Sequence, residues 1–300
     1  MDAHAGVEEM IATRTAQSFT NEMTLLDLLD RYMAAVEVSP RYRESLLRTV
    51  RRAKNSGLKE TCQLTTEEVN KFLAGLSVGQ TTRHNIRREL LTLWRFAHDR
   101  GFVEEYPTRI RKIRATFATP VTWELTRLSQ IIEAAEGDET PISSRIRLGR
   151  CDVIPAWAGL AYDSGMRFSD IHNLTKRSFR NDCVAVTASK TGKPLVRVLS
   201  ERTQHDVAKL FMHSPDGTLF KWLLPRRRAF HMWRAFLDEH GFGGSTKWFR
   251  RAAATAIEQL KPGAATDFLQ HSHPSLVRRH YLDATQAAIP MSPPPIRKPR

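Results

Sequence analysis

The segment HSHPSLVRRHYLD (residues 271–283) brings three histidines, two arginines and one tyrosine into a single short stretch. Such a cluster fits a metal site, a basic surface patch or the reacting end of an enzyme. The pair His271 and His273 could ligate a metal, but no Cys, Asp or Glu cluster accompanies it. We therefore predict no metal site, and the choice between the other two depends on the rest of the chain.

The composition indicates a globular protein with a polyanionic partner. The chain has 300 residues, enough for two domains, and 41% of them are hydrophobic. Its formal net charge is +14, which favours nucleic acid as the partner over a merely soluble basic protein. The three cysteines lie far apart in sequence, which argues against a disulfide framework or a zinc ribbon.

No segment resembles a membrane span or a signal peptide. No apolar run approaches the roughly 20 residues that a span needs, and acidic residues occupy the N-terminus where a signal peptide would carry lysine or arginine. We expect a soluble cytoplasmic protein with no membrane partner.

The first hundred residues predict a bundle of about four helices, from apolar residues at helical spacing over 23–36, 41–54 and 81–100. Thr65 and Glu68 form a capping-box pattern that opens the remaining, shorter helix. A single exposed arginine indicates only a solvated face, whereas repetition on two helices favours a phosphate-binding surface. The candidate DNA contacts of this kind are Arg41, Arg48, Arg52, Arg83, Arg87 and Arg88.

The rest of the chain predicts a mixed domain after a basic linker. Residues 102–122 lack a helical stripe and contain two prolines. Helices are expected over 124–135, 146–165, 201–212, 226–240 and 246–259, with a short one leading to His271, and a β-hairpin over 183–199. We predict a mainly α (α+β) fold: an extension (1–21), a helical bundle (22–105), a linker (106–122), a mixed, mostly helical domain with a small β-sheet or hairpin (123–287) and a proline-rich basic tail (288–300).

Three further segments carry residues that suit phosphate chemistry. Arg167 and Asp170 lie in AYDSGMRFSDIHNL, Lys190 and Lys193 in SKTGKP, and Lys247 and Arg250 in TKWFRRAAATAI.

Together with the histidine and tyrosine of the first segment, these side chains suit phosphoryl transfer without a metal. Two guanidinium groups can bind one phosphodiester and neutralise the charge that grows on it. Neighbouring cations favour the phenolate of a tyrosine, whose ordinary pKa is about 10, and so make it a nucleophile. A lysine on a turn can donate the proton that the leaving oxygen needs.

In this order the motifs resemble those of the tyrosine recombinases, the phage-integrase family, over about residues 22–287. The resemblance implies that residues 22–105 form the core DNA-binding domain and residues 123–287 the catalytic domain. GMRFSD resembles the first arginine box, SKTGK the β-hairpin lysine, FRRAAAT the second arginine box, and LQHSHP with RHYLD the histidine and tyrosine segment.

The resemblance implies a role for each matched residue. Arg167 and Arg250 would bind the scissile phosphate, Lys190 would protonate the 5′-oxygen, and His271 would bind a phosphate oxygen or assist proton movement. Tyr281 would attack and form a 3′-phosphotyrosyl link, and Asp170 would orient its neighbours.

The resemblance also implies how the protein works and with what. It would be a metal- and ATP-independent site-specific recombinase or integrase without a cofactor, belonging to a mobile element and acting at the prokaryotic nucleoid. Its partner would be double-stranded DNA. On paired DNA sites the chain would form a homotetramer, and away from DNA it would be a monomer or a dimer.

The sequence departs from the family pattern at several positions. Lys247 occupies the place of a usual histidine, Gln270 that of a frequent glycine, and the proline-rich tail is unlike a long terminal helix. His273 and His280 are interpreted as structural, and Arg278 and Arg279 as DNA-backbone or surface charges. Two alternatives stay open: a DNA-binding protein of the same fold without strand exchange, and a DNA-relaxing enzyme of the type IB topoisomerase kind.

Overall fold

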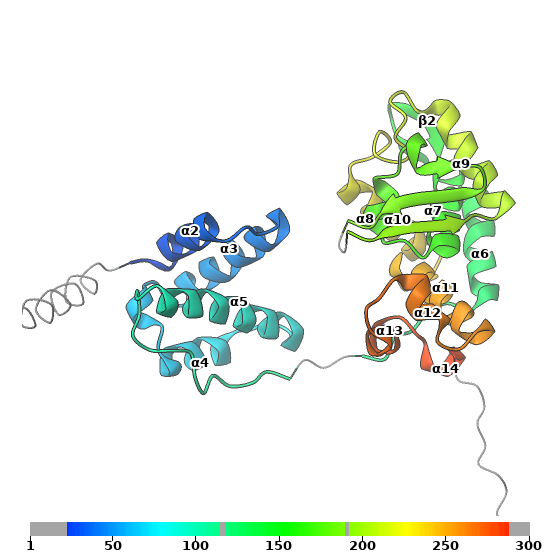
Figure 1. The fold of residues 1–300 in the computed structure, drawn as a ribbon. Helices are drawn as coiled ribbons and strands as arrows, with labels where there is room; N and C mark the ends of the chain where they lie inside the picture. Colours follow the sequence, from blue (N-terminus) through cyan, green and yellow to red (C-terminus); the bar gives the residue numbers. More distant parts are fainter. Residues whose placement is uncertain (1–22, 115–117, 190–191, 288–300) are drawn as a thin grey trace, which may run out of the picture. The chain divides into compact units, whose positions relative to one another are not determined.

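The computed structural model describes residues 23–114, 118–189 and 192–287, and the chain divides into two compact units, Met1–Phe117 and Ala118–Arg300. The described ranges contain thirteen α-helices and two small antiparallel sheets (Figure 1). The mainly α class predicted from the sequence is therefore confirmed. Every helix in these ranges is too short or too polar to span a lipid bilayer.

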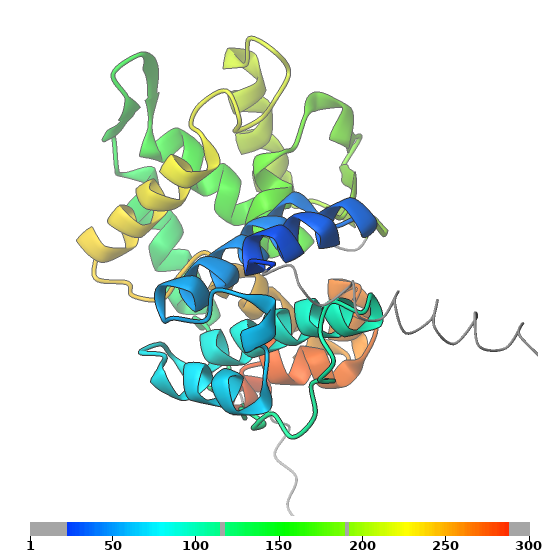
Figure 2. The ribbon, with the colours of Figure 1, turned by 90° about the vertical axis from the view of Figure 1, so that its left-hand side faces the viewer.

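Unit 1 is the predicted four-helix bundle. Its helices are α2 (Leu25–Ala35), α3 (Pro40–Asn55), α4 (Thr66–Gly75) and α5 (Gln80–Asp99), with a 3-10 turn η1 (Thr61–Gln63) before α4. Figures 1 and 2 both show α2 beside α3, and these two helices also contact each other directly. The core contains the fully buried Leu28, Leu46 and Trp94.

One buried carboxylate joins two helices of unit 1. The side chain of Glu89 on α5 is 3% exposed and accepts hydrogen bonds from Ser45 Oγ at 2.7 Å and Thr49 Oγ1 at 2.5 Å, both on α3. These bonds satisfy a group that would otherwise be costly to bury.

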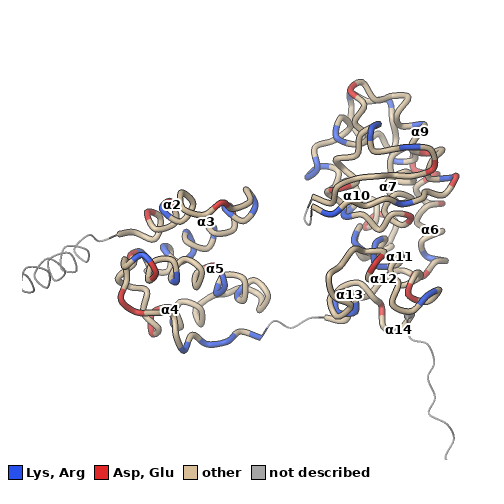
Figure 3. Tube along the Cα trace, viewed as in Figure 1, with Lys and Arg blue, Asp and Glu red and all other residues tan. Residues whose placement is uncertain are grey.

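Residues 103–113, here called the strap, follow α5 and pack onto unit 1. Val103 and Ile110 are buried in its core. Trp94 Nε1 donates to the Glu105 carbonyl at 2.6 Å, and the Arg87 guanidinium donates to the carbonyls of Ile110 and Arg111 at 3.0 and 2.9 Å. The strap is thus part of unit 1, and its basic residues form a run of blue after α5 (Figure 3).

Unit 2 is built around the helix α7, which is apolar on nearly every face and buried, as its uniform hydrophobicity requires. Trp157 on this helix packs against Phe168 and Phe220. The elements of the unit, in order, are α6 (Leu125–Glu136), β1 (Pro141–Ser143), β2 (Ile146–Gly149), α7 (Arg150–Ser164), α8 (Phe168–His172), η2 (Lys176–Ser178), β3 (Phe179–Arg180), β4 (Cys183–Thr187), β5 (Pro194–Val198), α9 (Glu201–His213), α10 (Arg226–Glu239), α11 (Lys247–Leu260), α12 (Ala264–Leu269), α13 (Pro274–His280) and α14 (Ala284–Ala287). Figure 1 shows α11 to α14 grouped at one end of the unit.

The β-hairpin predicted over 183–199 is confirmed, with Cys183 opposite Val198 and Thr187 opposite Pro194. The prediction of a helix over 146–165 is wrong at its start. Residues 146–149 form a strand that pairs with 141–143, and the helix begins at Arg150. The backbone groups of 146–149 are used in this pairing and cannot enter the helix.

Candidate active site

Arg250 on α11 lies at the centre of the candidate site, and its side chain is held by carbonyl groups from two other elements. The residue is 6% exposed. Its Nη1 donates to the carbonyl of Gly165, directly after α7, and its Nη2 donates to the carbonyl of Leu269 at the end of α12 at 3.2 Å. One guanidinium therefore joins the segment before Arg167 to the segment before His271.

His271 and Tyr281 meet at this guanidinium. Arg250 Nη2 lies 3.4 Å from His271 Nε2, which must accept because a guanidinium can only donate. Arg250 Cζ lies 5.0 Å from the centre of the Tyr281 ring, and the rings of His271 and Tyr281 are 4.9 Å apart. His271 and Tyr281 are ten residues apart in sequence, and their rings are in direct contact in the fold.

The electrostatics of Arg250 place Arg167 and Asp170 beside it. Burial lowers the pKa of Arg250 to about 10, and the charge of Arg167 lowers it too, whereas Tyr281 and Asp170 raise it. Arg250 remains protonated at neutral pH even so. The charge of Arg167 is therefore felt at Arg250.

Asp170 connects Arg167 to the β-hairpin. Its Oδ2 lies 3.8 Å from Arg167 Nη1, and its Oδ1 accepts hydrogen bonds from the hydroxyl of Ser189 at 2.5 Å and the amide of Ser189 at 3.3 Å. Ser189 directly precedes Lys190, which lies outside the described residues. Lys193, on the far side of the turn, is exposed.

Two further contacts hold the hairpin against α12. The Arg197 guanidinium donates to the carbonyls of Asp267 and Phe268, at 3.2 and 2.5 Å, and Gln270 Nε2 donates to the Pro194 carbonyl. Gln270 has a φ of 54°, in the left-handed region that favours glycine. This conformation gives a physical reason for the glycine that is frequent here in the family.

The remaining predicted residues are either exposed or bound to carbonyl groups of unit 1. Lys247 begins α11, three residues before Arg250, and its side chain is exposed. In unit 1, Arg41, Arg48, Arg52 and Arg88 are exposed. Arg83 and Arg87 instead bind carbonyl groups within the unit, Arg83 donating to Leu76 at 2.5 Å.

Arg251 also contacts the tyrosine segment, although the sequence analysis did not single it out. Its Nε donates to the carbonyl of His280, the residue before Tyr281, at 3.2 Å. Burial lowers the pKa of Arg251, while Tyr281 and Asp283 raise it. In the sequence Arg251 is simply the second arginine of FRR, and no local pattern distinguishes it.

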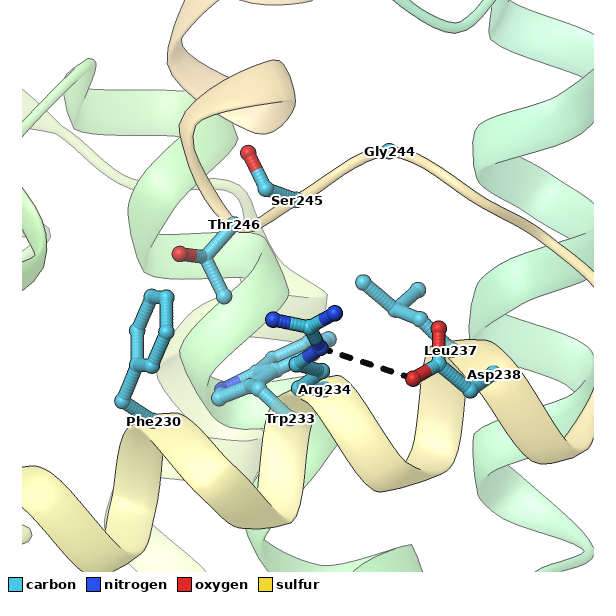
Figure 4. Close-up of a pocket in the computed structure, with 8 residues that line it drawn as sticks. All are labelled: Phe230, Trp233, Arg234, Leu237, Asp238, Gly244, Ser245 and Thr246. Carbon is cyan, nitrogen blue, oxygen red and sulfur yellow. Dashed lines mark ion pairs between the residues drawn. The ribbon is translucent and has the colours of Figure 1, made fainter. Parts of the chain in front are cut away.

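Unit 2 also has a small pocket of about 210 Å³ between α10 and the turn before α11 (Figure 4). Its lining includes Trp233 and Thr246, whose Nε1 and Oγ1 have no hydrogen-bond partner among the described residues. Arg234 and Asp238 form an ion pair at its wall at 3.6 Å. None of Arg167, Arg250, His271 and Tyr281 lines the pocket, so the candidate site is a separate surface.

Comparison with solved structures identifies the fold. The chain is similar to a lambda integrase dimer bound to a COC′ core site, with a TM-score of 0.73 and 15% identity over 94% of this chain and 83% of that one. It is also similar to residues 82–397 of the Tn1549 transposon integrase in complex with a circular intermediate DNA, with a TM-score of 0.69 and 13% identity over 90% of this chain and 96% of that one.

A third match is the XerH site-specific recombinase bound to difH substrate, in a pre-cleavage complex. The TM-score is 0.55 and the identity 16%, over 72% of this chain and 67% of that one. The chain has the tyrosine recombinase fold. The resemblance predicted from the four motifs is thus confirmed for the fold. No protein-family model and no curated protein matches the sequence, so the recombinase fold is recognised from structure and from a few short motifs.

Proposed function

We propose that this chain is a site-specific DNA recombinase or integrase that cleaves and rejoins DNA strands through a 3′-phosphotyrosyl intermediate. The observation that carries the proposal is the convergence of Tyr281 and His271 on the buried Arg250 guanidinium. The DNA-bound state of the similar structures supports the same substrate.

In the proposed reaction, the Tyr281 hydroxyl gives up its proton to solvent, directly or with the help of His271, its oxygen attacks the scissile phosphorus, and the bond to the 5′-oxygen breaks. Arg167 and Arg250 bind the non-bridging oxygens and neutralise the charge that develops on them. His271 binds one of these oxygens or helps to move a proton, and Asp170 keeps Arg167 oriented. Lys190 donates the proton that converts the leaving oxygen into a 5′-hydroxyl, and Lys247 supplies a further positive charge or donor in place of the usual histidine.

Rejoining reverses these steps with a 5′-hydroxyl from another strand. The phosphotyrosyl bond conserves the energy of the broken phosphodiester, so strand exchange needs neither ATP nor a metal ion. The solved structures to which the chain is similar include a lambda integrase tetramer bound to a Holliday junction. We propose a homotetramer on paired sites for this chain as well.

Unit 1 would bind the duplex through its exposed arginines, as the core DNA-binding domain of the recombinase. Arg41, Arg48 and Arg52 lie on α3 and are exposed, as phosphate contacts must be. Arg88 on α5 is exposed as well. Lys193, at the hairpin turn of unit 2, would add a contact near the scissile phosphate.

The test uses nicked duplexes made from the DNA that flanks the gene, in which cleavage releases a short strand and traps the covalent adduct. The wild-type chain is expected to form an adduct that survives denaturation, with the nucleotide attached at Tyr281 when the linked peptide is mapped by mass spectrometry. Tyr281→Phe is expected to abolish the adduct, whereas Tyr162→Phe, in the same unit, should form it normally. Equal adduct formation by Tyr281→Phe would contradict the proposed mechanism.

A second candidate function is DNA binding without strand exchange, which is favoured by the lysine that stands at position 247 in place of the usual histidine. It predicts salt-sensitive binding to the same duplexes with no covalent adduct from the wild-type chain. Relaxation of supercoiled plasmid without a preferred sequence would instead indicate an enzyme of the type IB topoisomerase kind.

A further inference from the structure

Arg251 bridges two segments that are far apart in sequence. While Arg250 points into the candidate site, the next side chain on α11 donates from Nε to the His280 carbonyl at 3.2 Å and from Nη1 to the Val121 carbonyl at 3.1 Å. His280 precedes the proposed nucleophile, and Val121 lies near the start of unit 2. Residues 280–283 are here called the tyrosine turn. The Arg251 guanidinium therefore connects the beginning of unit 2 to the backbone of this turn.

A second set of hydrogen bonds reinforces the same connection. The buried carboxylate of Asp283, two residues after Tyr281, accepts from the amide of Thr122 at 3.0 Å, and the Thr122 hydroxyl donates to the Trp248 carbonyl on α11 at 2.7 Å. Gln286 Nε2 donates to the Thr122 carbonyl at 3.3 Å. The tyrosine turn is therefore tied to residues 121–122 on both sides of Tyr281.

The helix that precedes Tyr281 is too short to fix the position of this residue by itself. It is α13, which has seven residues, whereas isolated helices shorter than about 12 residues are marginal in water. Tyr281 itself ends α13 with a φ of −129° and a ψ of −33°. The placement of its hydroxyl thus depends on contacts with other elements, namely the apolar cluster that buries Val277 and Leu282 and the hydrogen bonds from Arg251 and Thr122.

We propose that Arg251, together with the Thr122–Asp283 pair, positions Tyr281 for attack and makes that position depend on residues 121–122. These residues lie near the start of unit 2, before α6. This inference rests on the proposed function, because it assigns a role in the same strand cleavage. Arg251 acts through the His280 backbone, so it is a positioning residue and takes no part in the bond changes.

The experiment measures the single-turnover rate of covalent adduct formation on the nicked flanking-DNA duplexes. Arg251→Ala is expected to lower this rate by about 10- to 100-fold, since displacing a reacting group by about 1 Å can cost about 100-fold. The dissociation constant for the same duplex should change by less than about threefold. Arg251→Lys should recover part of the rate, because a lysine can still donate to the His280 carbonyl. The matched control is Arg127→Ala, which removes another arginine that donates to a carbonyl, that of Gly241, and should leave the rate unchanged.

A second substrate distinguishes a defect in positioning Tyr281 from a defect in protonating the leaving group. With sulfur in place of the bridging 5′-oxygen, the leaving group no longer needs a proton. The Arg251→Ala defect should persist on this duplex, whereas a defect in protonation would disappear. A melting temperature is measured for each variant, and Arg251→Lys carries the comparison if Arg251→Ala does not fold.

Three outcomes would overturn the inference: an Arg251→Ala rate within twofold of wild type, full recovery on the sulfur-containing duplex, or a loss of DNA affinity equal to the loss of rate. Failure of the wild-type chain to form any adduct would instead refute the proposed function, and the inference with it. The two failures are therefore distinguishable.

Discussion

Replacing Gly165 with alanine should destabilise unit 2 and disturb the candidate site together. Gly165 follows α7 with a φ of +59°, and a Cβ atom there would lie 2.6 Å from Phe268 Cε1 and 2.9 Å from Phe268 Cζ. Its carbonyl also accepts the hydrogen bond from Arg250 Nη1. The substitution therefore adds backbone strain and a steric clash at a residue that lies two positions before Arg167 and binds Arg250, the two proposed phosphate-binding arginines.

The magnitude follows from two separate terms. A non-glycine residue in the left-handed region costs about 1–2 kcal/mol, and overpacking a buried site costs about 1–3 kcal/mol more. For a unit of this size each kcal/mol lowers the melting temperature by roughly 2–4 °C. We expect the unfolding transition of unit 2 to fall by on the order of 10 °C, and adduct formation to slow as α12 and Arg250 shift.

The assay is differential scanning calorimetry of the full chain, with Gly217→Ala as the matched control. Gly217 has a φ of +73° but nothing within 4 Å of its Cβ position, so this variant carries only the backbone term. Adding Phe268→Ala to Gly165→Ala should relieve part of the clash. If Gly165→Ala and Gly217→Ala melt at the same temperature, the reasoning from the Phe268 contact is refuted.

Three other changes test features of the two units. Glu89→Ala should lower the free energy of unfolding of unit 1 by about 1–3 kcal/mol in urea titrations, because two buried hydroxyl groups lose their acceptor, whereas Glu89→Gln should cost less. Burial alone would raise the pKa of Asp138, but hydrogen bonds from Thr140 and the charge of Arg150 hold it below its ordinary 3.8. Asp138 therefore stabilises the fold above that pH, and the stability is lost as the pH falls below it. Melting temperatures measured between about pH 2 and pH 5 should fall less steeply for Asp138→Asn. Arg87→Ala should release the strap and speed its cleavage by trypsin, and an unchanged rate would mean that the strap is held by its apolar contacts alone.

Much of the fold could be predicted because its signals are local. Helical spacing of apolar residues is complete within each of the longer helices, and the motif order places Arg167, Arg250, His271 and Tyr281 without reference to distant contacts. The β1–β2 hairpin was missed because strands of three and four residues are too short to display an alternating pattern. The helices α8 and α13 are also too short for their periodicity to be read.

The parts that could not be predicted depend on contacts between distant segments. Arg250 and Arg251 are adjacent in sequence and of the same residue type, but successive residues of a helix point about 100° apart. Arg250 therefore binds the carbonyls of Gly165 and Leu269, whereas Arg251 binds those of Val121 and His280. Arg87 looks like an exposed phosphate contact, but its partners are carbonyls more than twenty residues away on the strap. Only the folded chain reveals which arginines already have acceptors.

The strap has a practical consequence for exchanging unit 1, the proposed DNA-binding part of this chain. A chimera joined at residue 105 would separate the strap from the helices on which it packs, leaving Arg87 without its acceptors and uncovering the surface beneath Ile110. A chimera joined after Thr122 would remove the partner of Asp283. A junction placed after residue 113 and before Val121 would keep the hydrogen bonds of Arg87 within unit 1 and those of Val121 and Thr122 within unit 2.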